Sequence, residues 1–287
     1  MSKPGHDQSG HLVRMDWGLT GAATLAAEIT VVIDVLSFTT TVGIAVERGI
    51  TVLPYAWRDE RAGEYAAERD AVLAVGRLER LGRLEQAGRV SLSPAAMARV
   101  HGIERIVLPS PNGSTIAFAL AGAGATVVAA SLRNATAVAE HLAPLLRDGA
   151  SCSVVPAGER WPDDTMRPCV EDLWGAGAVI AALGDLGATG FSPEVRVAEQ
   201  AFRAVRPHLA AELAACAGAL ELAAAGHGAD VEVSGQLDVS RIVPVLRGDA
   251  FVDAACVTPP RSRALLQGKG GFGHEGAQPS EELLEES

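Results

Sequence analysis

Runs of apolar and β-branched residues alternate with segments of helical period along most of the chain. The clearest run is Thr30-Val-Val-Ile-Asp34, which lies in a strand predicted over residues 29–36. A continuous Val/Ile run is typical of a strand that is buried on both faces of a sheet. Comparable runs, each leading toward a helical pattern, are found at residues 50–55, 105–110, 125–130 and 152–156. This alternation predicts a three-layer α/β/α fold around a mostly parallel or mixed sheet.

The C-terminal third is more strongly helical. Residues 194–225 are rich in Ala and Leu and predict two helices that are broken near Pro207. Short strands are expected after them at residues 231–233 and 242–246, because both segments are apolar and β-branched.

Three segments lack a clear period and are expected to be loops or turns. They are the turn around Trp17-Gly18, residues 76–90, and the polar segment 162–168. Residues 76–90 are rich in Arg, Gly and Glu, and a loop of this length inside a compact domain is more often functional than idle.

No change in composition marks a linker, so we expect one large domain over residues 11–258. Residues 1–10 are expected to form a disordered leader. Residues 259–287 are dominated by Gly, Pro and acidic residues, which predicts a disordered acidic tail.

Composition narrows the range of partners. The chain has 35 acidic and 24 basic residues and a formal net charge of −11, which argues against binding to nucleic acid or an anionic membrane. No apolar signal and no run of about twenty apolar residues is present, so a cytoplasmic protein is expected. The four cysteines have no CxxC spacing and are expected to be reduced core thiols. The Ala-rich helical surface makes a homodimer a reasonable expectation.

Asp34 is the first candidate for chemistry. A carboxylate at the end of a buried strand is costly unless it is hydrogen-bonded, paired or bound to a metal. Ser37 and Thr39 follow it where a helix is expected to begin, and such a helix start has free backbone N–H groups. A divalent cation and an anion could therefore meet here. The alternative interpretation is that Asp34 only caps the helix.

Other polar residues follow the remaining strands. In open α/β sheets, ligands bind outside the carboxyl ends of the strands. The polar residues expected there are Asp34, Asn112, Gly113, Ser114, Thr115, Ser131, Asn134, Glu159 and Arg160. Part of this polarity is expected of any loop at a sheet edge. The combination of carboxylates, hydroxyls, turns and an arginine nevertheless suits a hard cation with a phosphate.

Several catalytic motifs are missing from the sequence. It contains no Walker A motif, no Gly-x-Ser-x-Gly elbow and no His-x-x-x-His pair. Nucleotide binding at a P-loop, covalent serine catalysis and a zinc site are therefore unsupported.

Six segments together resemble a known family. They are Ile33-Asp-Val-Leu, Leu108-Pro-Ser-Pro-Asn-Gly-Ser-Thr115, Ser131-Leu-Arg-Asn-Ala135, Val155-Pro-Ala-Gly-Glu-Arg160, Glu171-Asp-Leu-Trp-Gly-Ala-Gly177 and Val243-Pro244. Their order and spacing resemble the 2-phosphosulfolactate phosphatase (ComB) family over residues 11–255. The resemblance implies a three-layer α/β fold, magnesium dependence and hydrolysis of 2-phosphosulfolactate in the route to coenzyme M.

The resemblance also implies roles for individual residues. Mg²⁺ is expected at Asp34 with one or both of Glu171 and Asp172, although these two acids could also simply complement a helix dipole. The phosphate is expected at the Asn112–Ser114 turn, together with Asn134. As a separate mechanistic hypothesis, Arg160 binds the remaining charge, and Glu159 or Asp34 is the candidate base.

One departure from the family concerns charge. Ser37 occupies a position where the family usually has an arginine, which would be a natural partner for an anionic group. Arg77 is a candidate replacement. Phosphatase chemistry could thus persist while sulfonate recognition changes. Two alternatives stay open, namely a metal-dependent hydrolase of another phosphorylated metabolite and a non-catalytic paralogue that binds an anion.

Overall fold

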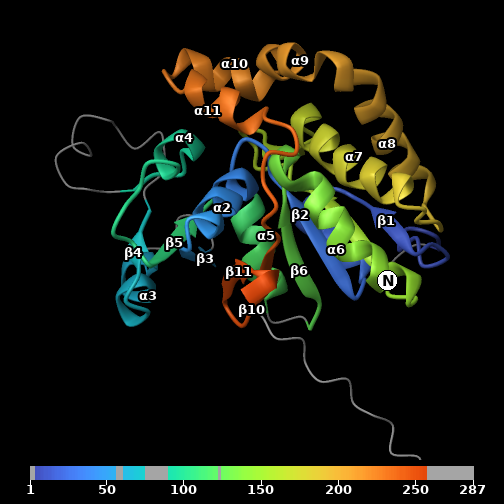
Figure 1. The fold of residues 1–287 in the computed structure, drawn as a ribbon, viewed down its shortest axis with the longest axis horizontal. Helices are drawn as coiled ribbons and strands as arrows, with labels where there is room; N and C mark the ends of the chain where they lie inside the picture. The colour runs from blue at the N-terminus through green and yellow to red at the C-terminus, as the bar shows by residue number, and fades with distance from the viewer. Residues whose placement is uncertain (1–3, 56–60, 75–89, 122–123, 257–287) are drawn as a thin grey trace, which may run out of the picture. The chain divides into compact units, whose positions relative to one another are not determined.

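The computed structural model describes residues 4–55, 61–74, 90–121 and 124–256 (Figure 1). The chain divides into two compact units, residues 1–257 and 258–287, and the second lies outside the described residues. In the first unit, nine strands form one sheet in the order β1-β7-β2-β6-β10-β11-β3-β5-β4. Their bounds are β1 Val13–Met15, β2 Ile29–Ile33, β3 Thr51–Tyr55, β4 Val72–Leu73, β5 Arg105–Pro109, β6 Thr126–Ala130, β7 Cys152–Pro156, β10 Pro244–Arg247 and β11 Ala250–Asp253.

The sheet consists of two parallel blocks joined by a hairpin. Strands β1, β7, β2 and β6 are parallel, and so are β3, β5 and β4. The β10–β11 hairpin lies between them and pairs antiparallel on both sides, through Val245 with Val128 and through Phe251 with Val52. Three successive antiparallel pairings reverse the strand direction between the blocks. The predicted mixed sheet is therefore confirmed.

Helices cover both faces of this sheet. Their bounds are α1 Gly18–Leu25, α2 Phe38–Glu47, α3 Ala62–Glu68, α4 Pro94–Met97, α5 Gly113–Leu120, α6 Ala135–Arg147, α7 Val170–Asp185, α8 Pro193–Val205, α9 Leu209–Ala215, α10 Ala217–Ala224 and α11 Gly228–Ser234. Alternate side chains of β2 face opposite layers, because successive residues of a strand point to opposite faces. Ile33 packs in the cluster that contains α6 and α7, whereas Val32 packs in the cluster that contains α2 and α5. The three-layer α/β/α prediction is therefore confirmed.

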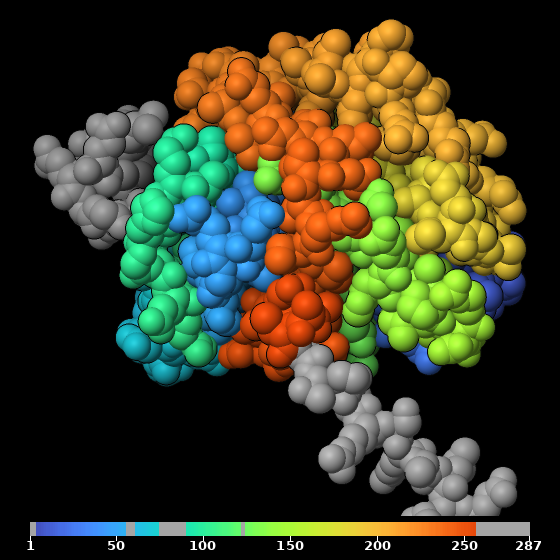
Figure 2. All heavy atoms as spheres, viewed as in Figure 1, coloured from blue at the N-terminus to red at the C-terminus, as the bar shows by residue number. Residues whose placement is uncertain are grey.

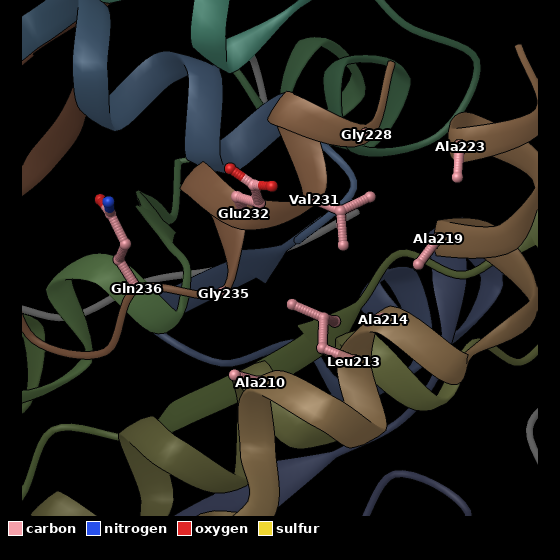
Figure 3. Close-up of a pocket in the computed structure, with 10 residues that line it drawn as sticks. All are labelled: Ala210, Leu213, Ala214, Ala219, Ala223, Gly228, Val231, Glu232, Gly235 and Gln236. Atoms are coloured by element: carbon pink, nitrogen blue, oxygen red, sulfur yellow. The ribbon is translucent and has the colours of Figure 1, made fainter. Parts of the chain in front are cut away.

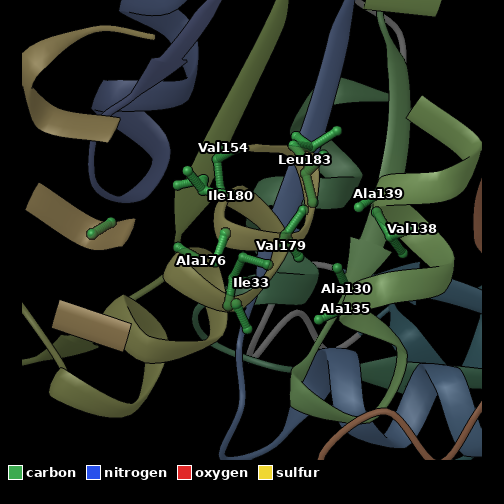
Figure 4. Close-up of a cluster of buried hydrophobic side chains, with 14 of the residues drawn as sticks. Ile33, Ala130, Ala135, Val138, Ala139, Val154, Ala176, Val179, Ile180 and Leu183 are labelled. Atoms are coloured by element: carbon green, nitrogen blue, oxygen red, sulfur yellow. The ribbon is translucent and has the colours of Figure 1, made fainter. Parts of the chain in front are cut away.

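The α7 side of the core is tightly packed. Ile33 lies beside Val179 and Ile180 of α7, with Val138 and Ala139 of α6 on the other side (Figure 4). All of these side chains are buried. Burying a valine or isoleucine side chain fully contributes roughly 1.5–3 kcal/mol to the stability of the fold. The packing of β2 therefore fixes the position of the backbone that leads into Asp34.

Helices α8 to α11 form a continuous band over one end of this unit (Figure 2). The predicted break near Pro207 is confirmed, since α8 ends at Val205 and a 3₁₀ turn follows at Arg206–His208. A further break at Cys216, between α9 and α10, was not expected. Within the described residues, no helix combines the length and apolarity needed to cross a membrane.

Some local predictions were wrong. Residues 231–233 lie in α11 and not in a strand, because Val231 and Ser234 form a buried face of helical spacing that a short apolar run does not reveal. The expected turn at Trp17 opens into α1, and the polar segment 162–168 contains part of a hairpin between β8 (Glu159–Arg160) and β9 (Met166–Arg167).

Residues 4–10 of the predicted N-terminal leader are among the described residues. Residues 4–10 form turns, and the Gln8 side chain both donates to the Met15 carbonyl (2.8 Å) and accepts from the Met15 amide (3.1 Å). A side chain that mimics a neighbouring strand in this way covers the open edge of β1. The loop 76–90 and the tail 259–287 lie outside the described residues, apart from residue 90.

Candidate active site

Asp34 lies directly after β2 and is only 6% exposed. Its Oδ1 accepts a hydrogen bond from the Phe38 amide (3.0 Å), and its Oδ2 accepts one from the Gly113 amide (2.9 Å). Thr39 Oγ1 accepts from the Asp34 amide and donates to the Asp34 carbonyl. The carboxylate is thus fixed at the start of α2, and it also reaches the start of α5.

Gly113 permits this contact because it has no side chain. A Cβ on Gly113 would lie 2.7 Å from Asp34 Oδ2 and 2.7 Å from Phe38 Cδ1. Real Cβ atoms do not approach other atoms so closely. The absence of a side chain therefore brings the end of β5 to the end of β2, although several strands separate the two in the sheet.

Asp172 is the second buried acid at this place. It lies in the first turn of α7 and is 3% exposed. Its Oδ1 accepts from the Val35 amide (2.8 Å), and its Oδ2 accepts from the Gly158 amide (2.9 Å). Each carboxylate oxygen of Asp34 and Asp172 therefore receives one backbone N–H, which holds both acids rigidly.

The charged form of Asp172 is unfavourable in this environment. Burial, and then the neighbouring charges of Asp34 and Glu171, raise the pKa of Asp172 well above its usual range, while the amides of Val35 and Gly158 oppose the shift. Asp172 forms no ion pair with any described residue. A bound cation would relieve this repulsion.

Glu171 does not join the pair in the way expected. Its Oε1 faces the α9–α10 junction, where a Cβ on Gly218 would lie 2.5 Å from it, and its charge helps to raise the pKa of the Cys216 thiol. Across the ranges that the structure describes, no group of three or more His, Cys, Asp or Glu side chains is arranged to hold a metal. Of the two acids that were expected beside Asp34, Asp172 therefore lies with it, whereas Glu171 faces the α9–α10 junction.

The two remaining acids fit magnesium by their donor chemistry. Mg²⁺ prefers oxygen ligands and is often bound by one or two carboxylates, with waters and substrate phosphate completing the octahedron. A carboxylate oxygen has two lone pairs, so each Asp172 oxygen, which accepts one N–H, can still bind a cation.

A cavity of about 370 Å³ lies beside the acid pair. Its walls are formed by Trp17, Gly18, Leu19, Thr20, Pro111, Asn112, Thr115, Ile116, Ala157, Glu159, Arg160, Asp164 and Met166. The cavity shares two turns with the acids, because Asn112 precedes the amide that binds Asp34 and Glu159 follows the amide that binds Asp172. Four predicted residues, Asn112, Thr115, Glu159 and Arg160, therefore meet here.

Glu159 is the central polar group of this cavity. Its Oε1 accepts from Asn112 Nδ2 (2.9 Å) and from the Arg160 amide (2.8 Å). Its Oε2 accepts no hydrogen bond from a described residue. The Arg160 side chain is 43% exposed and lies 3.9 Å from the Asp164 carboxylate. One carboxylate oxygen and one guanidinium are therefore accessible at the cavity.

Gly158 shapes the connection between the cavity and the acid pair. It has a φ of +66°, and a Cβ there would lie 2.8 Å from the Arg167 carbonyl of β9. This left-handed conformation suits glycine and aims the Gly158 amide at Asp172. The sequence gives no signal for the opposite wall, because α1 and Met166 belong to segments that were expected to be irregular.

Three predicted substrate-binding residues are structural instead. Ser114 is fully buried, and its hydroxyl bonds to the backbone of Tyr55 and Leu108. Ser131 and Asn134 cap the helix start after β6, and Asn134 Nδ2 donates to the Ile242 carbonyl (3.0 Å). Their polar groups bond mainly to backbone, and none of the three lines the cavity.

The three remaining predicted substrate-binding residues, Gly113, Thr115 and Arg77, differ in where they lie. The Gly113 amide is engaged by Asp34 and so is not free for a phosphate. The Thr115 hydroxyl donates to the Ser110 carbonyl (2.9 Å) at the cavity wall. Arg77 lies outside the described residues.

A second hollow, of about 430 Å³, lies between α9, α10 and α11 (Figure 3). Leu213, Ala219 and Val231 point into it, and Glu232 and Gln236 lie toward one side (Figure 3). None of the predicted site residues lines this hollow, so it is separate from the candidate active site.

Comparison with known proteins shows the family to which the chain belongs. A family model described as 2-phosphosulpholactate phosphatase matches residues 19–249, which include the acid pair and the cavity. The chain is 33% identical over 225 residues to the "Probable 2-phosphosulfolactate phosphatase" of Thermus thermophilus, an alignment that covers 77% of this chain and 89% of that protein. By class, these matches indicate a phosphatase, that is, a phosphoric monoester hydrolase. The chain belongs to the 2-phosphosulpholactate phosphatase family.

Proposed function

We propose that the protein is a magnesium-dependent phosphatase of a small phosphorylated hydroxy acid, with 2-phosphosulfolactate as the first candidate substrate. The observation that carries this proposal is the pair Asp34 and Asp172, held by four backbone amides at the ends of the strands. The family match supports the reaction class. The products would be sulfolactate and inorganic phosphate, on the route to coenzyme M.

Asp34 and Asp172 would hold the metal. When bound, Mg²⁺ supplies positive charge that offsets the two buried carboxylates and the phosphoryl oxygens. The four amides keep the carboxylates in place, so little reorganisation is needed when substrate arrives.

Glu159 and Arg160 are the proposed groups on the cavity side. Water attacks phosphorus, the bond between phosphorus and the alcohol oxygen breaks, and the proton lost by water reaches the departing oxygen. Glu159 would accept and return that proton through Oε2, because Oε1 is already engaged by Asn112 and the Arg160 amide. The Arg160 guanidinium would attract the anionic substrate toward the cavity.

The deciding experiment is phosphate release from 2-phosphosulfolactate with magnesium and then with excess EDTA. Turnover that needs magnesium supports both the reaction and the acid pair. Release only from other phosphorylated hydroxy acids would assign a different substrate, consistent with Ser37 at the position of the family's arginine. Thermal stabilisation by these compounds without any phosphate release would identify a binding protein and overturn the proposal.

A further inference from the structure

Glu171 is a buried acid that the proposed reaction does not use. It is 5% exposed and precedes Asp172 in the first turn of α7. Its charge contributes to the raised pKa of Asp172. A carboxylate in this position needs favourable contacts of its own, because burying a charge without them is costly.

Those contacts come from the junction between α9 and α10. Cys216 separates the two helices and is 7% exposed, and its thiol lies near the Glu171 carboxylate. Burial, and then the charge of Glu171, raise the pKa of this thiol to about 11, so it stays protonated and can donate.

Gly218 gives the carboxylate room at this junction. A Cβ there would lie 2.5 Å from Glu171 Oε1 and 3.5 Å from Leu36 Cδ1. Leu36 belongs to the short segment between Asp34 and the start of α2. The α9–α10 junction therefore touches both the residue before Asp172 and the segment after Asp34.

We propose that Gly218 and Cys216 are positioning residues that hold the Glu171 carboxylate in the α9–α10 junction, away from Asp172. Released from this contact, Glu171 would be free to approach Asp172, and like charges that approach one another disturb the geometry of the acid pair. This inference rests on the proposed function, because it assigns the reaction to Asp34 and Asp172.

The first test replaces Gly218→Ala and compares it with Gly228→Ala. Gly228 lies in the next helix, and nothing would lie within 4 Å of an added Cβ there. We expect Gly218→Ala to lower kcat by about tenfold to a hundredfold with a smaller change in KM, as for other small displacements of a reacting group. Gly228→Ala should keep the kcat of the wild type. Equal kcat values in both variants would overturn the proposal.

The second test is rescue by a shorter acid. In the Gly218→Ala variant, Glu171→Asp withdraws the carboxylate from the added methyl group. We expect the double variant to recover part of the lost kcat, whereas a merely destabilised helix would lose further activity with the second change. Failure of the shorter acid to raise kcat would contradict the positioning role.

The third test needs no enzymatic activity, so it separates this inference from the proposed function. Alkylation of Cys216 is followed in a Cys256→Ser background, because Cys256 is the exposed cysteine of the described chain. Glu171→Gln removes the charge that raises the thiol pKa, so alkylation of Cys216 at pH 8 should accelerate. An unchanged rate would show that the contact is absent, even if Gly218→Ala fails to fold.

Discussion

The Asp34 carboxylate accepts a hydrogen bond from the Gly113 amide at 2.9 Å, across 79 residues of sequence. This contact joins the ends of two strands that belong to oppositely directed blocks of the sheet. It also places Asn112, and with it Glu159, beside the acid pair. The cavity and the two acids are therefore parts of one site through this contact and the Gly158–Asp172 contact.

Gly113→Ala should disrupt that approach. The added Cβ would lie 2.7 Å from both Asp34 Oδ2 and Phe38 Cδ1, so the carboxylate or α5 must move. We expect a loss of about 1–3 kcal/mol in the free energy of unfolding, as for other overpacked buried sites, together with loss of turnover.

Gly43→Ala is the matched control, because nothing lies within 4 Å of a Cβ at that position of α2. An alanine in a helix interior should stabilise by about 0.5–1 kcal/mol relative to glycine. Urea denaturation of both variants checks the pair. A stable, fully active Gly113→Ala protein would contradict the geometry.

Asp34→Asn tests the carboxylate itself. An amide can accept a hydrogen bond only through its oxygen, so either the Phe38 or the Gly113 amide would face an NH₂ group. Leaving one buried donor unsatisfied costs about 1–3 kcal/mol. We expect turnover to disappear and the melting temperature to fall, measured by phosphate release and calorimetry. Retained turnover would remove Asp34 from the mechanism.

Part of this site could be predicted from the sequence. The Val/Ile run before Asp34 and the turn at Asn112 are local patterns, and neighbouring parallel strands bring their carboxyl ends to the same edge. That reasoning holds for Asp34 and Glu159, which follow the parallel neighbours β2 and β7. It does not account for Asn112, because β5 lies in the oppositely directed block and only the Gly113 contact brings its turn to Asp34. The sequence also suggested that Ser114 binds substrate. A hydroxyl residue at a helix start gives the same sequence pattern whether it faces a ligand or, as here, donates to the Tyr55 backbone.

The orientation of Glu171 could not be predicted in the same way. Two neighbouring acids in the first turn of a helix suggest a shared site in the sequence. In a helix, however, the side chains of consecutive residues point about 100° apart, so the two can face different surroundings. Which of them faces Asp34 depends on α10, whose start at Cys216 interrupts an Ala-rich helical pattern without a proline or a strong cap residue. Packing between segments far apart in the sequence determines the orientation of Glu171, and no local sequence pattern indicates it.

Glu159→Gln removes the negative charge at the cavity but can keep the hydrogen bonds of this side chain. It therefore distinguishes a catalytic role of the charge from a structural role. A glutamine oxygen can still accept from Asn112 Nδ2 and from the Arg160 amide, so the melting temperature should change little. If Glu159 transfers the proton, kcat should fall by about 10²–10⁴-fold. Steady-state kinetics at saturating substrate check this. Asp164→Asn, at a carboxylate that is 89% exposed on the cavity rim, is the control and should stay active.

The lowered pKa of His141 predicts that the free energy of unfolding decreases in mild acid. Burial, and then the charge of Arg247, lower its pKa, and Asp253 partly opposes them. The unfolded chain then binds a proton more readily than the folded one, so stability falls as pH drops below about 6.5 and continues to fall to the lowered pKa. Denaturation between pH 7.5 and pH 5 measures this. His141→Gln should flatten the dependence, and an identical slope in both proteins would contradict it.

Magnesium should stabilise the wild type through Asp172. The buried charge of Asp172 has no ionic partner among the described residues, and its pKa is raised, so a cation bound there favours the folded state. At a hundredfold excess over Kd, a ligand that binds only the folded protein adds about 2.7 kcal/mol. Asp172→Asn should be stabilised far less, because it lacks that charge. Thermal melts with Mg²⁺ and with EDTA measure the difference. An equal shift in both proteins would place the metal elsewhere and separate the acid pair from magnesium binding.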